Sequence, residues 1–134
     1  MDNKEKYLKW LEIAENDIDT ADFMFKNGRY SYVTFMCEQA VEKLVKGIYV
    51  YTYDKEAPYT HNINSIIVKI DTIANNPTYE NYISFINQLF LYYTATRYDA
   101  YKEKISKDLD NKTSEEIINK TKEVFEWLKS QVIL

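Results

Sequence analysis

The sequence fits a single small domain of modest negative charge. It has 134 residues, with 17 Lys and Arg against 21 Asp and Glu, for a formal net charge of −4. A chain of this length fills one hydrophobic core. Because the net charge gives no general attraction for a polyanion, any nucleic-acid contact needs a local cluster of basic residues.

Cysteine content and apolar runs indicate the compartment. Cys37 is the single cysteine, so a disulfide within the chain is excluded and a reducing compartment is expected. No apolar segment of the signal type follows Met1, and the run LFLYY at 89–93 is too short to cross a bilayer. We expect a cytoplasmic protein that contacts neither membrane nor DNA.

Apolar spacing predicts helices from the start of the chain. Two glycines and two prolines leave few turn signals. Steps of three and four residues run from Tyr7 to Phe25, and Asn27–Gly28 ends this helix with glycine in the C′ position. A second helix is predicted from Tyr30 to Tyr53. Gly47 inside it indicates close approach of a neighbouring helix.

Three further helices are predicted beyond the loop that contains Pro58. A short one runs from Ile63 to Ile73 and stops before Pro77, and a longer one carries apolar residues from Tyr79 to Tyr93. Thr113 and Glu116 have the spacing of a capping box for the last helix. Residues 1–134 therefore predict one all-α domain, an antiparallel four-helix up-and-down bundle with one additional short helix.

The second helix carries charged residues beside its apolar stripe. A helical rotation of about 100° per residue sets Glu38 and Glu42 opposite the stripe. Glu42 and Lys46 have the i,i+4 spacing of an exposed ion pair, so we predict both on the surface. Lys43 falls at the border of the stripe, and we predict that it points to a groove shared with the 79–93 helix.

His61 is the only histidine and lies next to Asn62, the predicted N-cap of the short third helix. A single loop histidine without cysteine neighbours is not a metal site. Two interpretations stay open: a loop or capping residue, or a general base that needs an orienting partner. The sequence has no glycine-rich phosphate loop and no nucleophile elbow, so neither a metal nor a cofactor is expected.

Arg97 follows the apolar pattern of the 79–93 helix, in the segment TATRYDAYKEK at 94–104. Tyr93 and Tyr98 flank it. A guanidinium beside aromatic rings at a helix end suits a phosphate or carboxylate ligand. The alternative is a structural ion pair with Asp99 or with another helix.

Four segments in order resemble the HEPN family, the small helical domain named for higher eukaryotes and prokaryotes nucleotide-binding. They are WLEIAENDIDTADFMFKNGRY at 10–30, QAVEKLVKG at 39–47, THNI at 60–63 and TRYD at 96–99. The last three are similar to the family's Q-A-x-E-K-x-x-K-A, T-H-[DN]-L and T-R-Y-P patterns. The resemblance covers nearly the whole chain.

The resemblance implies a dimeric four-helix bundle, often encoded beside a minimal nucleotidyltransferase in toxin–antitoxin-like modules. Family members with an Arg-x(4–6)-His motif are metal-independent ribonucleases, in which arginine holds the scissile phosphate and histidine moves the proton. In this chain the histidine positions after Arg97 hold Lys102, Glu103 and Lys104. Lys104 also stands where a related variant has a tyrosine that the partner transferase adenylylates.

These residues give three hypotheses of function. The first is a homodimer that binds a nucleotide or RNA phosphate through Arg97, Lys102, Lys43, Tyr98 and His61, lacks full nuclease activity and works with a nucleotidyltransferase. The second is a metal-independent ribonuclease toxin in which Arg97 acts with a displaced proton-transfer group, His61 or Glu103. The third is a pure interaction module. The 13 tyrosines suit helix seams and a dimer interface, or base stacking.

Overall fold

The chain forms a helical bundle in a computed structural model that describes residues 1–98 and 109–134. All regular structure in those residues is helical, which confirms the predicted all-α fold class. The elements are α1 (Asn3–Lys26), α2 (Tyr30–Tyr53), α3 (Ile63–Ile67), α4 (Asp71–Ala74), the 3₁₀ helix η1 (Pro77–Asn81), α5 (Ile83–Thr96) and α7 (Asn111–Ser130). Asp99, Lys102, Glu103 and Lys104 lie outside the described residues.

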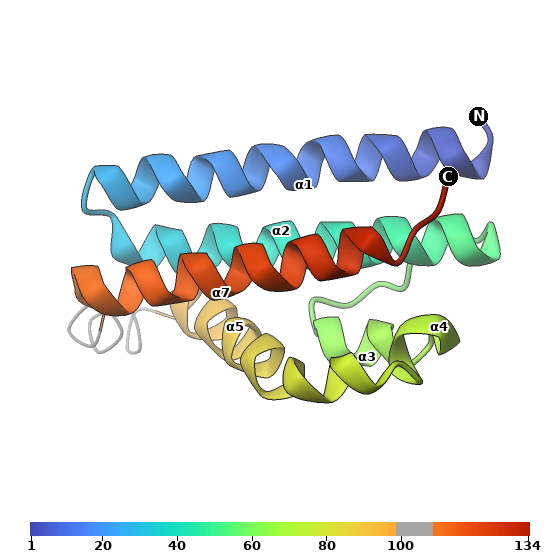
Figure 1. Cartoon of the computed structure of the whole chain (residues 1–134). Coiled ribbons are helices and arrows are strands. Elements are labelled where there is room, and N and C mark those ends of the chain that lie inside the picture. The colour runs from blue at the N-terminus through green and yellow to red at the C-terminus, as the bar shows by residue number, and fades with distance from the viewer. Residues whose placement is uncertain (99–108) are drawn as a thin grey trace.

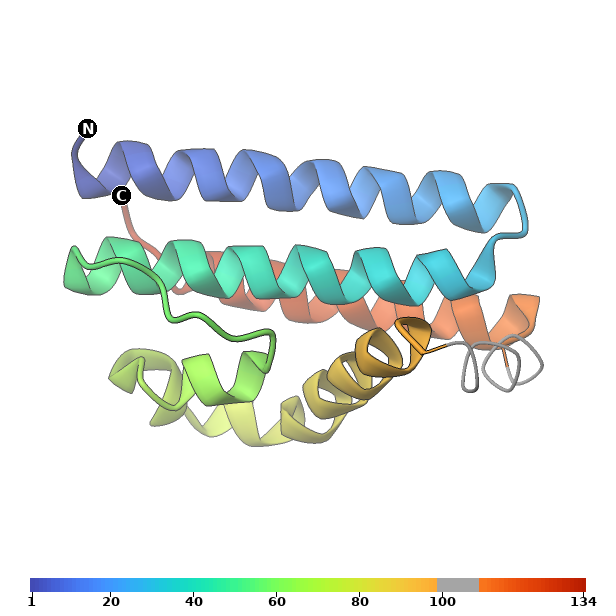
Figure 2. The same cartoon turned by 180° about the vertical axis from the view of Figure 1, so that it is seen from behind.

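The helix α2 is the centre of the bundle (Figures 1 and 2). It packs against α1 and α7 on one side and against α3 and α5 on the other. The two chain ends lie at the same end of the molecule, while the C-terminal end of α5 lies near the start of α2 at the opposite end. A helix enclosed in this way has little surface left for solvent.

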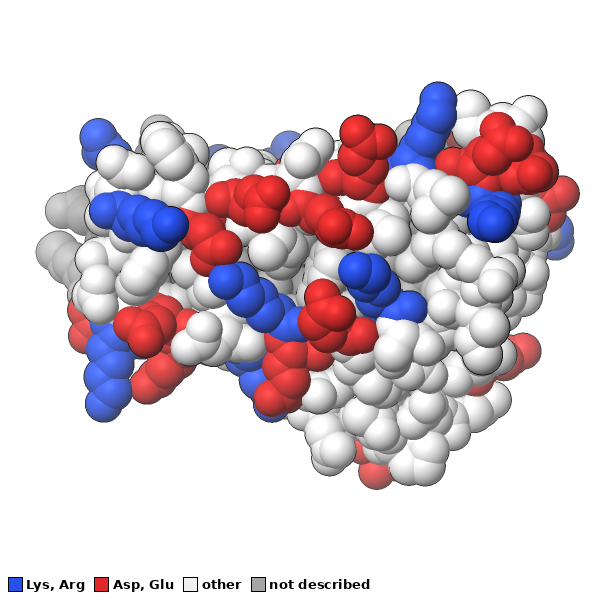
Figure 3. Space-filling view, turned by 45° about the horizontal axis from the view of Figure 1, so that its top comes forward, with Lys and Arg blue, Asp and Glu red and all other residues white. Residues whose placement is uncertain are grey.

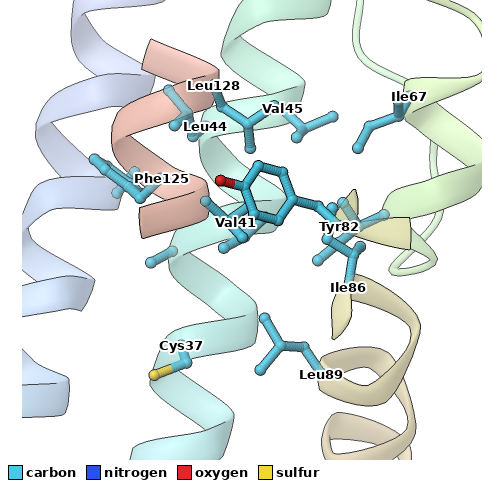
Figure 4. Packing of buried hydrophobic residues seen from close by; sticks show 14 of the residues in the cluster. Cys37, Val41, Leu44, Val45, Ile67, Tyr82, Ile86, Leu89, Phe125 and Leu128 are labelled. Atoms are coloured by element: carbon cyan, nitrogen blue, oxygen red, sulfur yellow. The ribbon is translucent and has the colours of Figure 1, made fainter. Parts of the chain in front are cut away.

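Apolar side chains from three sides of the bundle meet along α2 (Figure 4). The ring of Tyr82 enters the space between α2 and α7, and its centroid lies 5.3 Å from that of Trp127. Fully buried Leu44 and Leu128 pack in the same cluster. The burial of these large side chains supplies the main free energy that holds the helices together.

The two glycines occupy the positions that the sequence predicts. Gly28 ends the α1–α2 turn with φ of +70°, a conformation that glycine adopts without steric cost. At Gly47 a Cβ atom would lie 2.6 Å from the Cβ of Trp10. The prediction of close helix approach at Gly47 is therefore confirmed, and α1 packs directly on the backbone of α2.

Two of the predicted helices are shorter than expected. The helix over Ile63–Ile73 breaks into α3 and α4, because Ile70 is extended (φ −108°, ψ 94°). The Tyr53 hydroxyl bridges the break, donating to Lys69 O (2.7 Å) and accepting from Asp71 N (3.2 Å). Tyr79 lies in η1, so the predicted 79–93 helix begins only at Ile83.

The capping box predicted at Thr113 and Glu116 is wrong. Asp110 is the N-cap of α7, and its carboxylate accepts a hydrogen bond from Thr113 N at 2.7 Å. Its backbone is extended, as an N-cap requires, which moves the helix start three residues upstream. Within the described residues, no helix is both long enough and apolar enough to cross a bilayer.

Candidate functional site

Polar side chains converge where α2, the loop before α3 and the end of α5 meet. They come from segments far apart in the sequence, and we refer to them as the α2–α5 polar cluster. Its members are Glu38, Glu42, Lys46, His61, Tyr93 and Arg97.

Glu42 bonds directly to two other members of the cluster. Its side chain is buried, yet it keeps two charged or polar partners: Oε2 accepts from Lys46 Nζ at 3.1 Å, and Oε1 lies 3.0 Å from His61 Nδ1. The prediction that Glu42 and Lys46 lie on the surface is wrong, since their side chains are only 5 % and 14 % exposed. The reason is that α3 and α5 cover the side of α2 that apolar spacing alone assigns to solvent.

Glu38, one turn before Glu42, is completely buried. Its Oε2 accepts a hydrogen bond from Gln39 Nε2 at 2.8 Å, whereas Oε1 has no partner among the described residues. Burial, with the added repulsion of the neighbouring Glu42, raises the pKa of Glu38 to about 9. Glu38 is therefore a neutral carboxylic acid at pH 7, and the two carboxyls carry one negative charge between them.

His61 is held by Glu42 in one orientation. Because an ionised carboxylate can only accept, the Nδ1 hydrogen of His61 points to Glu42 and the Nε2 atom is left for another partner. The His61 side chain is 50 % exposed. Asn62 is the N-cap of α3, as predicted, and the backbone turn before it is fixed by a bond from Asn62 N to Thr60 Oγ1.

Arg97 is the C-cap of α5 and lies against Tyr93, one helical turn earlier. Its Nη1 donates to Tyr93 Oη at 3.2 Å, and its Cζ lies 5.4 Å from the centroid of the Tyr93 ring. The His61 ring centroid is 4.9 Å from the same ring. Tyr93 therefore contacts both the exposed guanidinium and the imidazole.

Tyr93 itself is well fixed. Phe35 from α2 stacks on it, with ring centroids 5.6 Å apart and an interplanar angle of 25°. Burial raises the pKa of Tyr93, although the Arg97 charge opposes this shift. The phenol therefore stays protonated at neutral pH and serves as a rigid wall rather than as a base.

The other predicted site residues lie elsewhere or outside the described chain. The prediction that Lys43 points to a groove shared with α5 is wrong, because Lys43 Nζ bonds Asp17 of α1 at 2.8 Å. Tyr98 is exposed and lines an apolar pocket on α5 with Leu91. Lys102 and Glu103 are not among the described residues.

Sequence reasoning missed Glu38 and Tyr93 as members of the site and gave Glu42 the wrong environment. The segment QAVEKLVKG contained a usable signal for Glu42. It resembles a family motif, and a charged residue in such a motif is expected to have a role other than an exposed ion pair. The i,i+4 spacing of Tyr93 and Arg97 was also visible. Nothing in the sequence distinguishes Glu38 from a solvated glutamate.

The face formed by α1 and α7 has a different character (Figure 3). Basic and acidic side chains alternate across it, and some pair between the helices, such as Lys122 with Asp22 at 2.9 Å. The small groove between these helices is lined by Glu15, Asp19 and Glu126 beside Lys122. An anionic ligand would meet acidic groups there, so the site of interest is the one beside Arg97.

The described residues form a small all-α bundle in which an arginine and a carboxylate-held histidine lie against one tyrosine. The chain belongs to the HEPN domain family, whose profile matches residues 7–131. Searches of curated proteins and of solved structures found no significant match. Family membership supports a function that involves nucleotides or RNA in general terms.

The buried acid Glu38 makes stability depend on pH. Its folded-state pKa, about 9, lies above the ordinary glutamate value of 4.5. The folded state therefore holds a proton that the unfolded state has released, and the free energy of unfolding falls as pH rises between these values. We expect Glu38→Gln to remove much of this slope and to raise stability at pH 7 by on the order of 2 kcal/mol.

Urea unfolding of both proteins at several pH values between about 5 and about 9 measures this difference. The wild type is the control for all other titrating groups, since these are common to the two proteins. Parallel pH profiles, with no gain for the glutamine variant, would contradict a neutral Glu38.

Proposed function

We propose that this protein binds the phosphate of a nucleotide or of RNA between Arg97 and His61. The observation that carries the proposal is the convergence of both side chains on the Tyr93 ring. A guanidinium offers paired N–H donors that match phosphate oxygens. The free Nε2 edge of His61 adds a second polar contact on a side chain that Glu42 holds in place.

The charge balance of the cluster supports an anionic ligand. Lys46 compensates Glu42, and Glu38 is neutral because of its raised pKa. Among the described residues, no carboxylate pairs with Arg97, whose guanidinium has a hydrogen bond there to Tyr93. Counted over the described residues alone, the cluster therefore has one positive charge in excess, although the whole chain is negative.

Arg97→Ala tests this role directly. We expect affinity for a nucleotide or short RNA to fall by roughly 10- to 100-fold, the loss of a charge-assisted contact of about 1.5–3 kcal/mol. The melting temperature should change little, because an exposed arginine contributes little to stability. A binding titration and a thermal melt measure the two effects.

Lys9→Ala is the matched control, since it removes one positive charge from an exposed position near the start of α1. It should leave binding nearly unchanged. A large fall in melting temperature for Arg97→Ala, together with no detectable ligand for the wild type, would identify Arg97 as structural and leave the interaction-module hypothesis.

The second part of the proposal is a homodimer that works beside a nucleotidyltransferase in a toxin–antitoxin-like module. The transferase is supported by family membership alone. The dimer is also supported by the apolar pocket on α5, which is lined by Leu91, Thr94, Ala95 and Tyr98. Exposed apolar surface of this kind is typical of protein–protein contacts.

We expect sedimentation at micromolar concentration to show a dimer, and Leu91→Glu to shift it to monomer because a charge would be buried in the contact. Val68→Glu is the control, since Val68 on the turn between α3 and α4 is 60 % exposed and Leu91 is 57 % exposed. A wild-type protein that sediments only as monomer would refute the dimer.

The His61–Glu42 pair favours one alternative, a metal-independent ribonuclease. In such a reaction His61 Nε2 takes the proton of a ribose 2′-hydroxyl and the 2′-oxygen attacks phosphorus. The P–O5′ bond breaks, and the leaving 5′-oxygen takes the proton from the His61 imidazolium. Arg97 would balance the charge on the phosphate, and Glu42 would stabilise the imidazolium. The binding proposal differs in having no such step.

Incubation of purified protein with RNA in excess EDTA separates the two functions. The binding proposal expects no cleavage above background. Cleavage that is lost in His61→Ala, and reduced in Glu42→Gln at unchanged RNA affinity, would establish the ribonuclease instead. Cleavage that survives His61→Ala would implicate another group, such as Glu103.

A further inference from the structure

A small pocket opens beside Arg97 and Phe35, and Glu42 is not part of its lining. It is lined by Ser31, Tyr32, Phe35, Thr96 and Arg97, and we refer to it as the Tyr32 pocket. We infer that the Tyr32 pocket takes a single unpaired nucleobase, whose own phosphate reaches Arg97. This inference rests on the proposed phosphate site and names the class of ligand that the site selects.

The aromatic walls of the pocket suit a flat, uncharged ring. Phe35 is held by its stack on Tyr93 at 5.6 Å, so the orientation of its ring is set before any ligand arrives. Tyr32 is 54 % exposed, although it is a large aromatic residue. Stacking of a base on such a ring is a common way for proteins to hold single-stranded nucleic acid.

The polar atoms of the pocket are few and suit base edges. The Thr96 hydroxyl donates to Tyr93 O at 2.8 Å, which leaves its oxygen as an acceptor. Ser31 adds a second hydroxyl-bearing side chain to the lining of the pocket. Hydroxyls at an aromatic wall provide hydrogen bonds to any base without strong preference for one.

The size of the pocket favours one base over a whole nucleotide or a base pair. Its volume is about 160 Å³, whereas pockets that enclose complete small ligands measure about 300–1,000 Å³. A base enters such a space only when it is not stacked in a duplex. The protein should therefore distinguish unpaired from paired RNA through Tyr32, while Arg97 contributes affinity common to all phosphates.

The test compares three probes of equal length: an oligouridylate of about six nucleotides, the same ribose-phosphate chain without bases, and a blunt RNA duplex. The inference expects the base-containing single strand to bind about tenfold more tightly than either of the others. Tyr32→Ala should reduce its affinity to that of the abasic chain, and Tyr32→Phe should restore it. Arg97→Ala should weaken all three probes.

Phe23→Ala is the matched control, because Phe23 on α1 is 63 % exposed and lies outside the lining of the Tyr32 pocket. It should leave every affinity unchanged. Sedimentation of Tyr32→Ala accompanies the titrations, since a change in oligomeric state would assign Tyr32 to the contact between copies and overturn the inference.

The remaining outcomes separate the inference from the proposed function. Equal affinity for abasic and base-containing strands, lost in Arg97→Ala but not in Tyr32→Ala, overturns the base pocket and leaves the phosphate site standing. Binding that is insensitive to Arg97→Ala, or absent for all three probes, overturns both.

Discussion

The two bonds of the Glu42 carboxylate are the interaction on which the candidate site depends. A charge that is almost completely buried needs compensation, and Lys46 and His61 provide it from the same helix and from the loop before α3. Among the described residues, the His61 side chain has no other long-range hydrogen bond. The orientation of His61, and with it the position of the imidazole against Tyr93, follows from burying Glu42.

Glu38 shows why the cluster keeps only one negative charge. Two carboxylates one turn apart on an enclosed helix cannot both ionise without a large cost, and Glu38 is the one with a single neutral partner, Gln39. Because Glu38 keeps its proton, the negative charge of the two carboxyl groups lies on Glu42. The guanidinium of Arg97 lies at the surface, against Tyr93.

The packing of α1 on α2 makes this arrangement possible. Because Gly47 has no side chain, Trp10 approaches the backbone of α2 directly, and the ion pair of Lys43 with Asp17 joins the same two helices. With α1 and α7 filling one side of α2, the other side is free for α3 and α5. The polar cluster is built on this second side, so the same helix serves the core and the site.

Local signals in the sequence determined the helices and several of their ends. Apolar spacing gave the all-α fold, Gly28 and Asn62 ended or began helices as expected, and ordered motifs gave the family. These features depend on residues close together in the chain, so they can be read without knowing the partner helices.

Tertiary structure alone decided the environment of the charged residues. Periodicity describes a helix with one apolar face, whereas α2 is covered on several sides. Glu42 is therefore buried, Lys46 is largely covered, and Lys43 turns to α1. The break at Ile70 depends on a hydroxyl from Tyr53, which lies in another helix. The meeting of His61 and Arg97 at Tyr93 likewise joins residues from two distant segments, and only packing brings such segments together, because burial and pairing depend on neighbours in space.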